Sequence, residues 1–138
     1  MFHYTAETTA SVQNAIAALE TSLKEEQFGV LWRFNLREKL KEKGFDFERE
    51  YVVLEVCNPA EANRVISENV LAGYFLPCKI VVYEADGKTK IGMPDYDRYL
   101  RHWYQTHAKP GFFPMTEKEY YLYALRERYE KGGVTRCC

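Results

Sequence analysis

Hydrophobic residues in the first 93 positions follow two spacings, one typical of strands and one typical of helices. Segments rich in β-branched and aromatic residues predict five strands: 2–6, 28–34, 51–57, 79–84 and 88–93. Helical spacing or helix-start signals mark three more segments: 11–26, 35–44 and 58–73. The order β-α-β-α-β-α-β-β indicates an α+β fold, with a mixed β-sheet and helices packed on one face.

Capping and turn residues set the predicted boundaries. Asn58 followed by Pro59 is a typical helix start, and Gly73 is the expected stop of that helix. The helix should bury an apolar stripe made of Ala62, Val65, Ile66 and Val70. The pair Asp86-Gly87 predicts a hairpin turn. The strand after it carries lysines, which suit a sheet edge.

The composition changes after Met93, where tyrosine and arginine become frequent. Asp95 can cap a helix that runs to about Thr106. Thr116 and Glu119 form a capping-box pattern for a second helix, 117–131. The chain is therefore predicted to have two parts, an α+β domain over 1–91 and a two-helix tail over 92–138.

Composition and charge narrow the classes of function. The 138 residues are 46% hydrophobic and 28% charged, which is enough for a packed core. A net charge of −1 and the lack of a nucleic-acid motif predict no nucleic-acid partner. No apolar run approaches the ~20 residues of a membrane span, and no signal-peptide pattern begins the chain. These features predict a cytoplasmic protein that is not membrane-embedded.

The first part resembles the prokaryotic domain-of-unknown-function family 302. The resemblance rests on Phe28-Gly29-Val30-Leu31, Cys57-Asn58-Pro59 and Leu76-Pro77-Cys78, in that order. It covers about residues 1–91 and implies a compact α+β fold that tends to form dimers. It implies no established reaction.

The tail is similar to the YbdD/YjiX family of very small bacterial proteins. The similarity includes Ile91-Gly92-Met93-Pro94-Asp95-Tyr96-Asp97, Pro114-Met115-Thr116 and the closing Arg136-Cys137-Cys138. It implies a link to CstA-type transporters for pyruvate or peptides, because genes of this family often lie beside theirs. The segment 108–113 departs from the family, since it replaces the short linker that is usual there.

The paired cysteines at the end of the chain are the first candidates for chemistry. Arg136 lies beside Cys137 and Cys138 and favours their thiolates, whereas the terminal carboxylate opposes them. Two thiolates suit thiol exchange or a soft-metal site, with Cu(I) or Zn(II) as the ions to consider. The alternative is an exposed, inert tail.

Cys57 is a further redox or metal candidate. It precedes the helix cap Asn58, where unpaired helix N–H groups would lower the pKa of a thiol. The favoured interpretation is a small buried residue at a strand end. Cys78 is expected at the opposite end of the sheet, more than ~15 Å away. No disulfide between Cys57 and Cys78 is therefore predicted.

Aromatic and histidine side chains of the tail are interaction candidates, together with Arg136. Tyr96, Tyr99 and Trp103 recur at helical spacing, which favours docking on the domain over a ligand platform. His102 and His107 are about 140° apart on a regular helix, so they cannot share a metal there. Polar packing is the favoured role of His102.

Two functions compete. No catalytic set of residues is visible, which favours a non-catalytic module that binds a small ligand or a protein, as an accessory to a CstA-type transporter. The alternative is a thiol-redox or soft-metal-handling protein that uses Cys137 and Cys138.

A homodimer is also predicted, in which the aromatic tail helices cover the α+β domain of the same or the other chain. The second face of strand 51–57 carries Tyr51, Val53, Glu55 and Cys57, a mixture that suits a subunit interface. The alternative is a monomer in which the aromatic tail buries that face.

Overall fold

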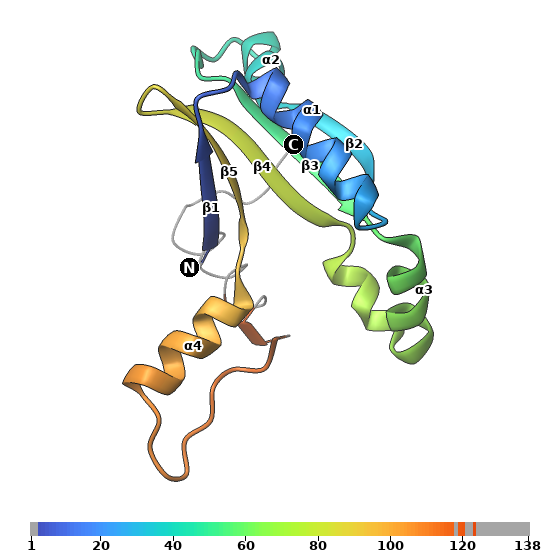
Figure 1. Ribbon diagram of the computed structural model, residues 1–138, viewed down its shortest axis with the longest axis vertical. Helices are drawn as coiled ribbons and strands as arrows, with labels where there is room; N and C mark the ends of the chain where they lie inside the picture. Colours follow the sequence, from blue (N-terminus) through green and yellow to red (C-terminus); the bar gives the residue numbers. More distant parts are fainter. Residues whose placement is uncertain (1–2, 118, 121–122, 124–138) are drawn as a thin grey trace. The chain divides into compact units, whose positions relative to one another are not determined.

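The computed structural model describes residues 3–117, 119–120 and 123, and these residues form two compact units (Figure 1). The first unit, Thr5–Met93, is called the sheet domain below. The second combines residues 3–4 with the described residues from Pro94 onward, and is called the tail unit.

The sheet has the spatial order β1-β5-β4-β3-β2. Its strands are β1 His3–Thr8, β2 Gly29–Asn35, β3 Tyr51–Cys57, β4 Cys78–Ala85 and β5 Lys88–Pro94. The pairs β2–β3, β3–β4 and β4–β5 are antiparallel. The α+β class is thus confirmed, whereas the strands run antiparallel where the alternation of strands and helices had suggested a mixed sheet.

Helix length explains the strand directions. Helix α2, Leu36–Glu42, has 7 residues and spans about 10 Å, less than half the length of a seven-residue strand. It therefore turns the chain at one end of the sheet instead of carrying it back for a parallel strand. Helix α3, Pro59–Glu68, and the 3₁₀ helix η1, Val70–Phe75, turn the chain at the other end (Figure 1).

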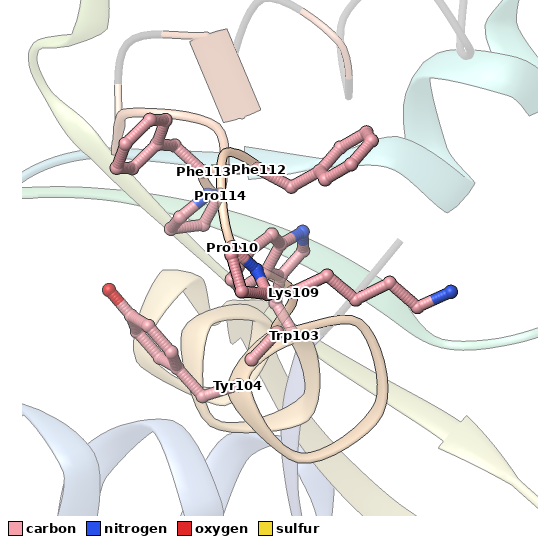
Figure 2. A pocket seen from close by; sticks show the side chains of 8 residues that line it. Trp103, Tyr104, Lys109, Pro110, Phe112, Phe113 and Pro114 are labelled. Carbon is pink, nitrogen blue, oxygen red and sulfur yellow. The ribbon is translucent and has the colours of Figure 1, made fainter.

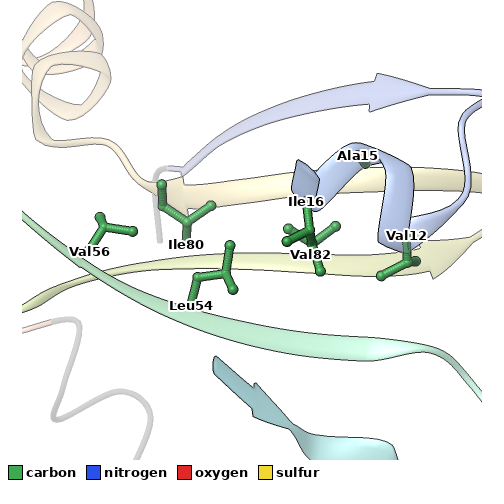
Figure 3. Close-up of a cluster of buried hydrophobic side chains, with 7 residues drawn as sticks. All are labelled: Val12, Ala15, Ile16, Leu54, Val56, Ile80 and Val82. Carbon is green, nitrogen blue, oxygen red and sulfur yellow. The ribbon is translucent and has the colours of Figure 1, made fainter. Parts of the chain in front are cut away.

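Among the α-helices of the sheet domain, α1, Val12–Glu25, lies across a face of the sheet, whereas α2 and α3 lie at its ends, so the predicted packing of helices on one face holds for α1 (Figure 1). Helix α1 has 14 residues, or about 21 Å, enough to follow the strands. Its apolar stripe meets the inward residues of the two central strands (Figure 3). The buried core consists of Val12, Ala15, Ile16, Leu54, Val56, Ile80 and Val82.

Local capping signals are confirmed where they were predicted. The side chain of Asn58 accepts hydrogen bonds from the backbone N–H groups of Ala60 and Glu61, at 3.1 and 3.3 Å. At the hairpin, Asp86 and Gly87 have φ values of 55° and 71°, the left-handed conformation that a tight hairpin turn requires.

Two further predictions, on the end of α3 and on the place of β5, are also wrong. Helix α3 ends at Glu68 rather than at Gly73, and Asn69 caps η1 instead. Consequently the expected buried stripe is broken, since Ile66 is 41% exposed and Val70 is 74% exposed. Strand β5 is not an edge strand, because β1 pairs along its outer side.

Ion pairs with acidic side chains stabilise the lysines of β5, which therefore do not need a position on a sheet edge. Lys88 and Lys90 both contact Glu7 on the neighbouring strand, at 3.1 and 3.4 Å, and Lys90 also contacts Asp86 at 2.9 Å. These pairs hold the pKa values of Glu7 and Asp86 below their usual range.

In the tail unit, helix α4 runs from Tyr96 to Thr106 with Asp95 as its cap, as predicted. The capping box is also present: the N–H of Thr116 donates to Glu119 at 2.8 Å, and the N–H of Glu119 donates to the Thr116 hydroxyl at 3.3 Å. Most of the predicted second tail helix, 117–131, lies outside the described residues.

Candidate functional site

The side of the sheet opposite α1 carries a set of large side chains, called the aromatic face below. Cross-strand register places its members, because directly paired residues share one face of a sheet. The aromatic face consists of Trp32, Phe34, Tyr51, Val53, Val81 and Tyr83. Ring contacts reinforce the register: Trp32 stacks on Phe34 at 5.3 Å between centroids, and Tyr51 stacks on Tyr83 at 5.4 Å.

Burial and charge distinguish the aromatic face from the core. Leu54 on the α1 side is 0% exposed, whereas Val53 next to it is half-buried and Trp32 is 52% exposed. One ion pair crosses the aromatic face, from Lys79 Nζ to Glu55 Oε1 at 3.0 Å. Aromatic side chains are enriched at protein interfaces relative to the rest of a protein surface. The predicted second face of β3 is therefore part of a larger apolar surface.

Cys57 and Cys78 lie at the same end of the sheet, which corrects the predicted distance between them. Because β3 and β4 are antiparallel, Val56 pairs directly with Cys78, and Cys57 is the next residue along. Both remain thiols, as predicted, for a different reason. Successive residues of a strand point to opposite faces, so the two sulfurs point away from each other.

Cys57 itself is half-buried at the end of β3, directly before the α3 cap Asn58. The Asn58 side chain takes two of the backbone N–H groups at the helix start. Fewer of these N–H groups remain for the Cys57 sulfur, which supports the interpretation of Cys57 as a structural residue.

Three tyrosines form the centre of the tail unit. The ring centroids of Tyr96, Tyr99 and Tyr120 lie 5.0 to 5.8 Å apart. The Tyr96 hydroxyl donates to the Met115 carbonyl at 2.7 Å, and the Met115 N–H donates to the Tyr99 hydroxyl at 2.8 Å. Burial raises the pKa of Tyr96. Tyr96 and Tyr99 thus hold the segment after α4 against the helix.

Trp103 lies farther along α4 and lines an open hollow of about 400 Å³ (Figure 2). The other walls come from the helix end and the segment that follows it: Tyr104, Ala108, Lys109, Pro110, Phe112, Phe113 and Pro114. The two phenylalanines are 68% and 85% exposed, respectively. This segment includes the residues in which the chain departs from the YbdD/YjiX pattern. The hollow presents aromatic rings, two prolines and one amine to solvent.

His102 and His107 come close together, against the expectation from a regular helix. Helix α4 ends at Thr106, and His107 takes a non-helical conformation with φ −124°. Its backbone N–H still donates to the Trp103 carbonyl at 2.8 Å. This end geometry turns His107 back towards His102, so that the ring centroids lie 5.8 Å apart.

The remaining predicted site residues, Arg136, Cys137 and Cys138, lie outside the described residues. Their redox or metal role stays a prediction. Within the described ranges, no three His, Cys, Asp or Glu side chains converge as a metal site. No helix in the part of the chain that the structure describes is long and apolar enough to cross a membrane.

Local sequence patterns do not reveal most of the aromatic face. Alternation in β3 identified Tyr51 and Val53, but their partners on β2 and β4 depend on strand order and register. A bulge between Val30 and Trp32 adds a further shift that no local pattern signals. The hollow was missed because Phe112 and Phe113 follow a glycine turn without helical or strand periodicity.

Comparison with known proteins assigns a family to most of the chain. A family described as "Domain of unknown function DUF302" matches residues 4–111, more than three quarters of the chain. The chain belongs to the DUF302 family. A DUF302 protein of known structure, an uncharacterized conserved protein from Bacillus stearothermophilus, is 56% identical with a TM-score of 0.67. The match covers 74% of this chain and 80% of that one.

The DUF302 match is followed by a second, overlapping one. A family described as "Selenoprotein, putative" matches residues 87–138. The uncharacterized protein YbdD of Escherichia coli K12 is 43% identical over 51 residues, which are 37% of this chain and 75% of YbdD. YbdD of Shigella flexneri matches equally well. This DUF302 protein therefore carries a YbdD-like C-terminal region, and both resemblances stated from the sequence are confirmed.

Proposed function

We propose that this DUF302 protein is a non-catalytic interaction module, a homodimer that acts at the cytoplasmic side of a CstA-type transporter. In this proposal the α+β domain over 1–91 forms the dimer, and the YbdD-like tail over 92–138 contacts the transporter. The observation that carries it is the aromatic face, whose rings are only half covered and lie beside the Lys79–Glu55 ion pair.

A second copy of the chain is the partner proposed for the aromatic face. The face combines aromatic rings with valines at its centre and charged side chains among them, and this composition favours a protein partner over bulk water. In a two-fold dimer each copy contributes the same patch to the interface, so the apolar centre of the aromatic face is buried on both copies.

Light scattering of the full chain tests the dimer. Val53→Lys places a charge in the centre of the aromatic face and should give a monomer. Val70→Lys is the matched control, since Val70 is 74% exposed on η1, and this variant should remain a dimer. A monomeric wild-type chain, or a dimer unaffected by Val53→Lys in a variant with unchanged circular dichroism, would contradict the proposal.

The transporter contact is proposed for the tail unit, because the YbdD-like region adjoins an exposed apolar segment. Tagged full-length protein should copurify with a CstA-type transporter from detergent-solubilised membranes of a strain that encodes both. Replacing Phe112 and Phe113 together by serine should weaken this association. Tyr74→Ser, at a residue 80% exposed on the sheet domain, is the control. Repeated purification without any transporter would end the proposal.

A further inference from the structure

The end of helix α4 brings two imidazole rings together in the tail unit. His102 lies in the last turns of the helix, and His107 follows its final residue, Thr106. Their ring centroids are 5.8 Å apart and their planes are inclined by 77°. Both side chains are exposed, so ions in solution can reach them.

The separation of the rings fits one shared metal ion. A zinc–imidazole bond of about 2.0–2.1 Å puts each ring centre about 3.2 Å from the ion, so two rings on one tetrahedral ion have centres about 5 to 6 Å apart. The observed 5.8 Å lies in this range. Rotation about the exposed side-chain bonds is then enough to direct a nitrogen of each ring at the ion.

Two contacts at the helix end hold the backbone that carries the two histidines. The His107 N–H donates to the Trp103 carbonyl at 2.8 Å, and the Thr106 hydroxyl donates to the His102 carbonyl at 2.7 Å. These contacts fix the backbone of His107 against the last turn of the helix. The carboxyl end of a helix also carries partial negative charge, which favours a cation.

We infer that His102 and His107 form a two-histidine site for a divalent transition-metal ion. Imidazole nitrogens suit Zn(II), Ni(II) and Cu(II), whereas Mg(II) and Ca(II) prefer oxygen ligands. Two protein ligands leave coordination positions for water or for a group of a bound partner. The site uses no residue of the aromatic face and neither Cys137 nor Cys138, and does not rest on the proposed function.

Zinc titration followed by NMR of the full-length chain tests the site. The imidazole resonances of His102 and His107 should shift together on adding Zn(II) alone and saturate at one zinc concentration. The resonances of His3, an exposed histidine outside the site, should not follow the same curve. Addition of Mg(II) in place of Zn(II) should leave all three unchanged.

Variants distinguish a shared ion from independent binding. In His102→Asn, the same shift of the His107 resonance should need a zinc concentration at least about tenfold higher, because one of the two ligands is lost. His107→Asn should have the reciprocal effect, and His3→Asn should have none. The inference is overturned if neither ring responds at millimolar zinc, or if His107 saturates at the same concentration with and without His102.

Discussion

Thr89 is a buried polar residue that joins β5 to the segment between β1 and α1, and its replacement by valine should destabilise the domain. Thr89 is 4% exposed on β5, and its hydroxyl donates to the Ala10 carbonyl at 2.7 Å. Valine preserves the shape of threonine but leaves that carbonyl without its donor. A buried group left unsatisfied costs about 1–3 kcal/mol.

Serine at the same position separates the hydrogen bond from packing. Thr89→Ser keeps the hydroxyl and removes one methyl group, which costs about 0.8 kcal/mol of burial. Thr89→Val should therefore cost more than Thr89→Ser. With a urea dependence of about 1–3 kcal/mol per molar, a loss of 2 kcal/mol lowers the unfolding midpoint by about 1 M. Urea unfolding followed by circular dichroism measures both variants. If Thr89→Ser unfolds at a lower urea concentration than Thr89→Val, packing of the methyl group outweighs the hydrogen bond and the prediction is refuted.

Three further predictions concern helix caps and the tyrosine cluster. Asn58→Ala should lower stability by about 1 kcal/mol in urea unfolding, whereas Asn58→Asp, which can still accept the cap hydrogen bonds, should stay near wild type. Tyr99→Phe should speed hydrogen exchange of the Met115 amide, while Tyr104→Phe, at an exposed ring, should not. The pKa of Glu119 is lowered by the hydrogen bonds of its capping box, so its contribution is present above the unfolded carboxyl pKa and is lost as pH falls through the folded value. Exchange protection of the Thr116 amide, which donates to the Glu119 carboxylate, should therefore fall on acidification, and Glu119→Gln should flatten that dependence.

Sequence signals that act within a few residues predicted the fold well. Asn58-Pro59 and Asp86-Gly87 set their turns through their own side chains and backbone preferences, so no distant contact was needed. Asp95 likewise fixed the start of α4. Strand order is different, because it depends on which distant segments pair. The lysines of β5 suggested an edge, yet Glu7 supplies their partner from a strand more than 80 residues earlier.

The candidate sites were predictable to different degrees. Alternation in β3 located two of the six residues of the aromatic face, Tyr51 and Val53, since period two follows from strand geometry alone. The distance between Cys57 and Cys78 was wrong because it assumed a parallel return after α3. The approach of His102 and His107 was missed because a helical wheel assumes a regular helix through residue 107, and α4 ends one residue earlier.

The placement of β1 outside β5 has a consequence for synthesis on the ribosome. Ala10 and Thr89 are 79 positions apart, so β1 can pair with β5 only after nearly the whole domain has left the ribosome. Until then the outer backbone groups of β5 have no strand beside them. Contacts of such long range make folding slow, because a large loop must close before they form. Nascent chains shorter than about 90 residues plus the ribosomal tunnel length should therefore remain protease-sensitive at the N-terminus.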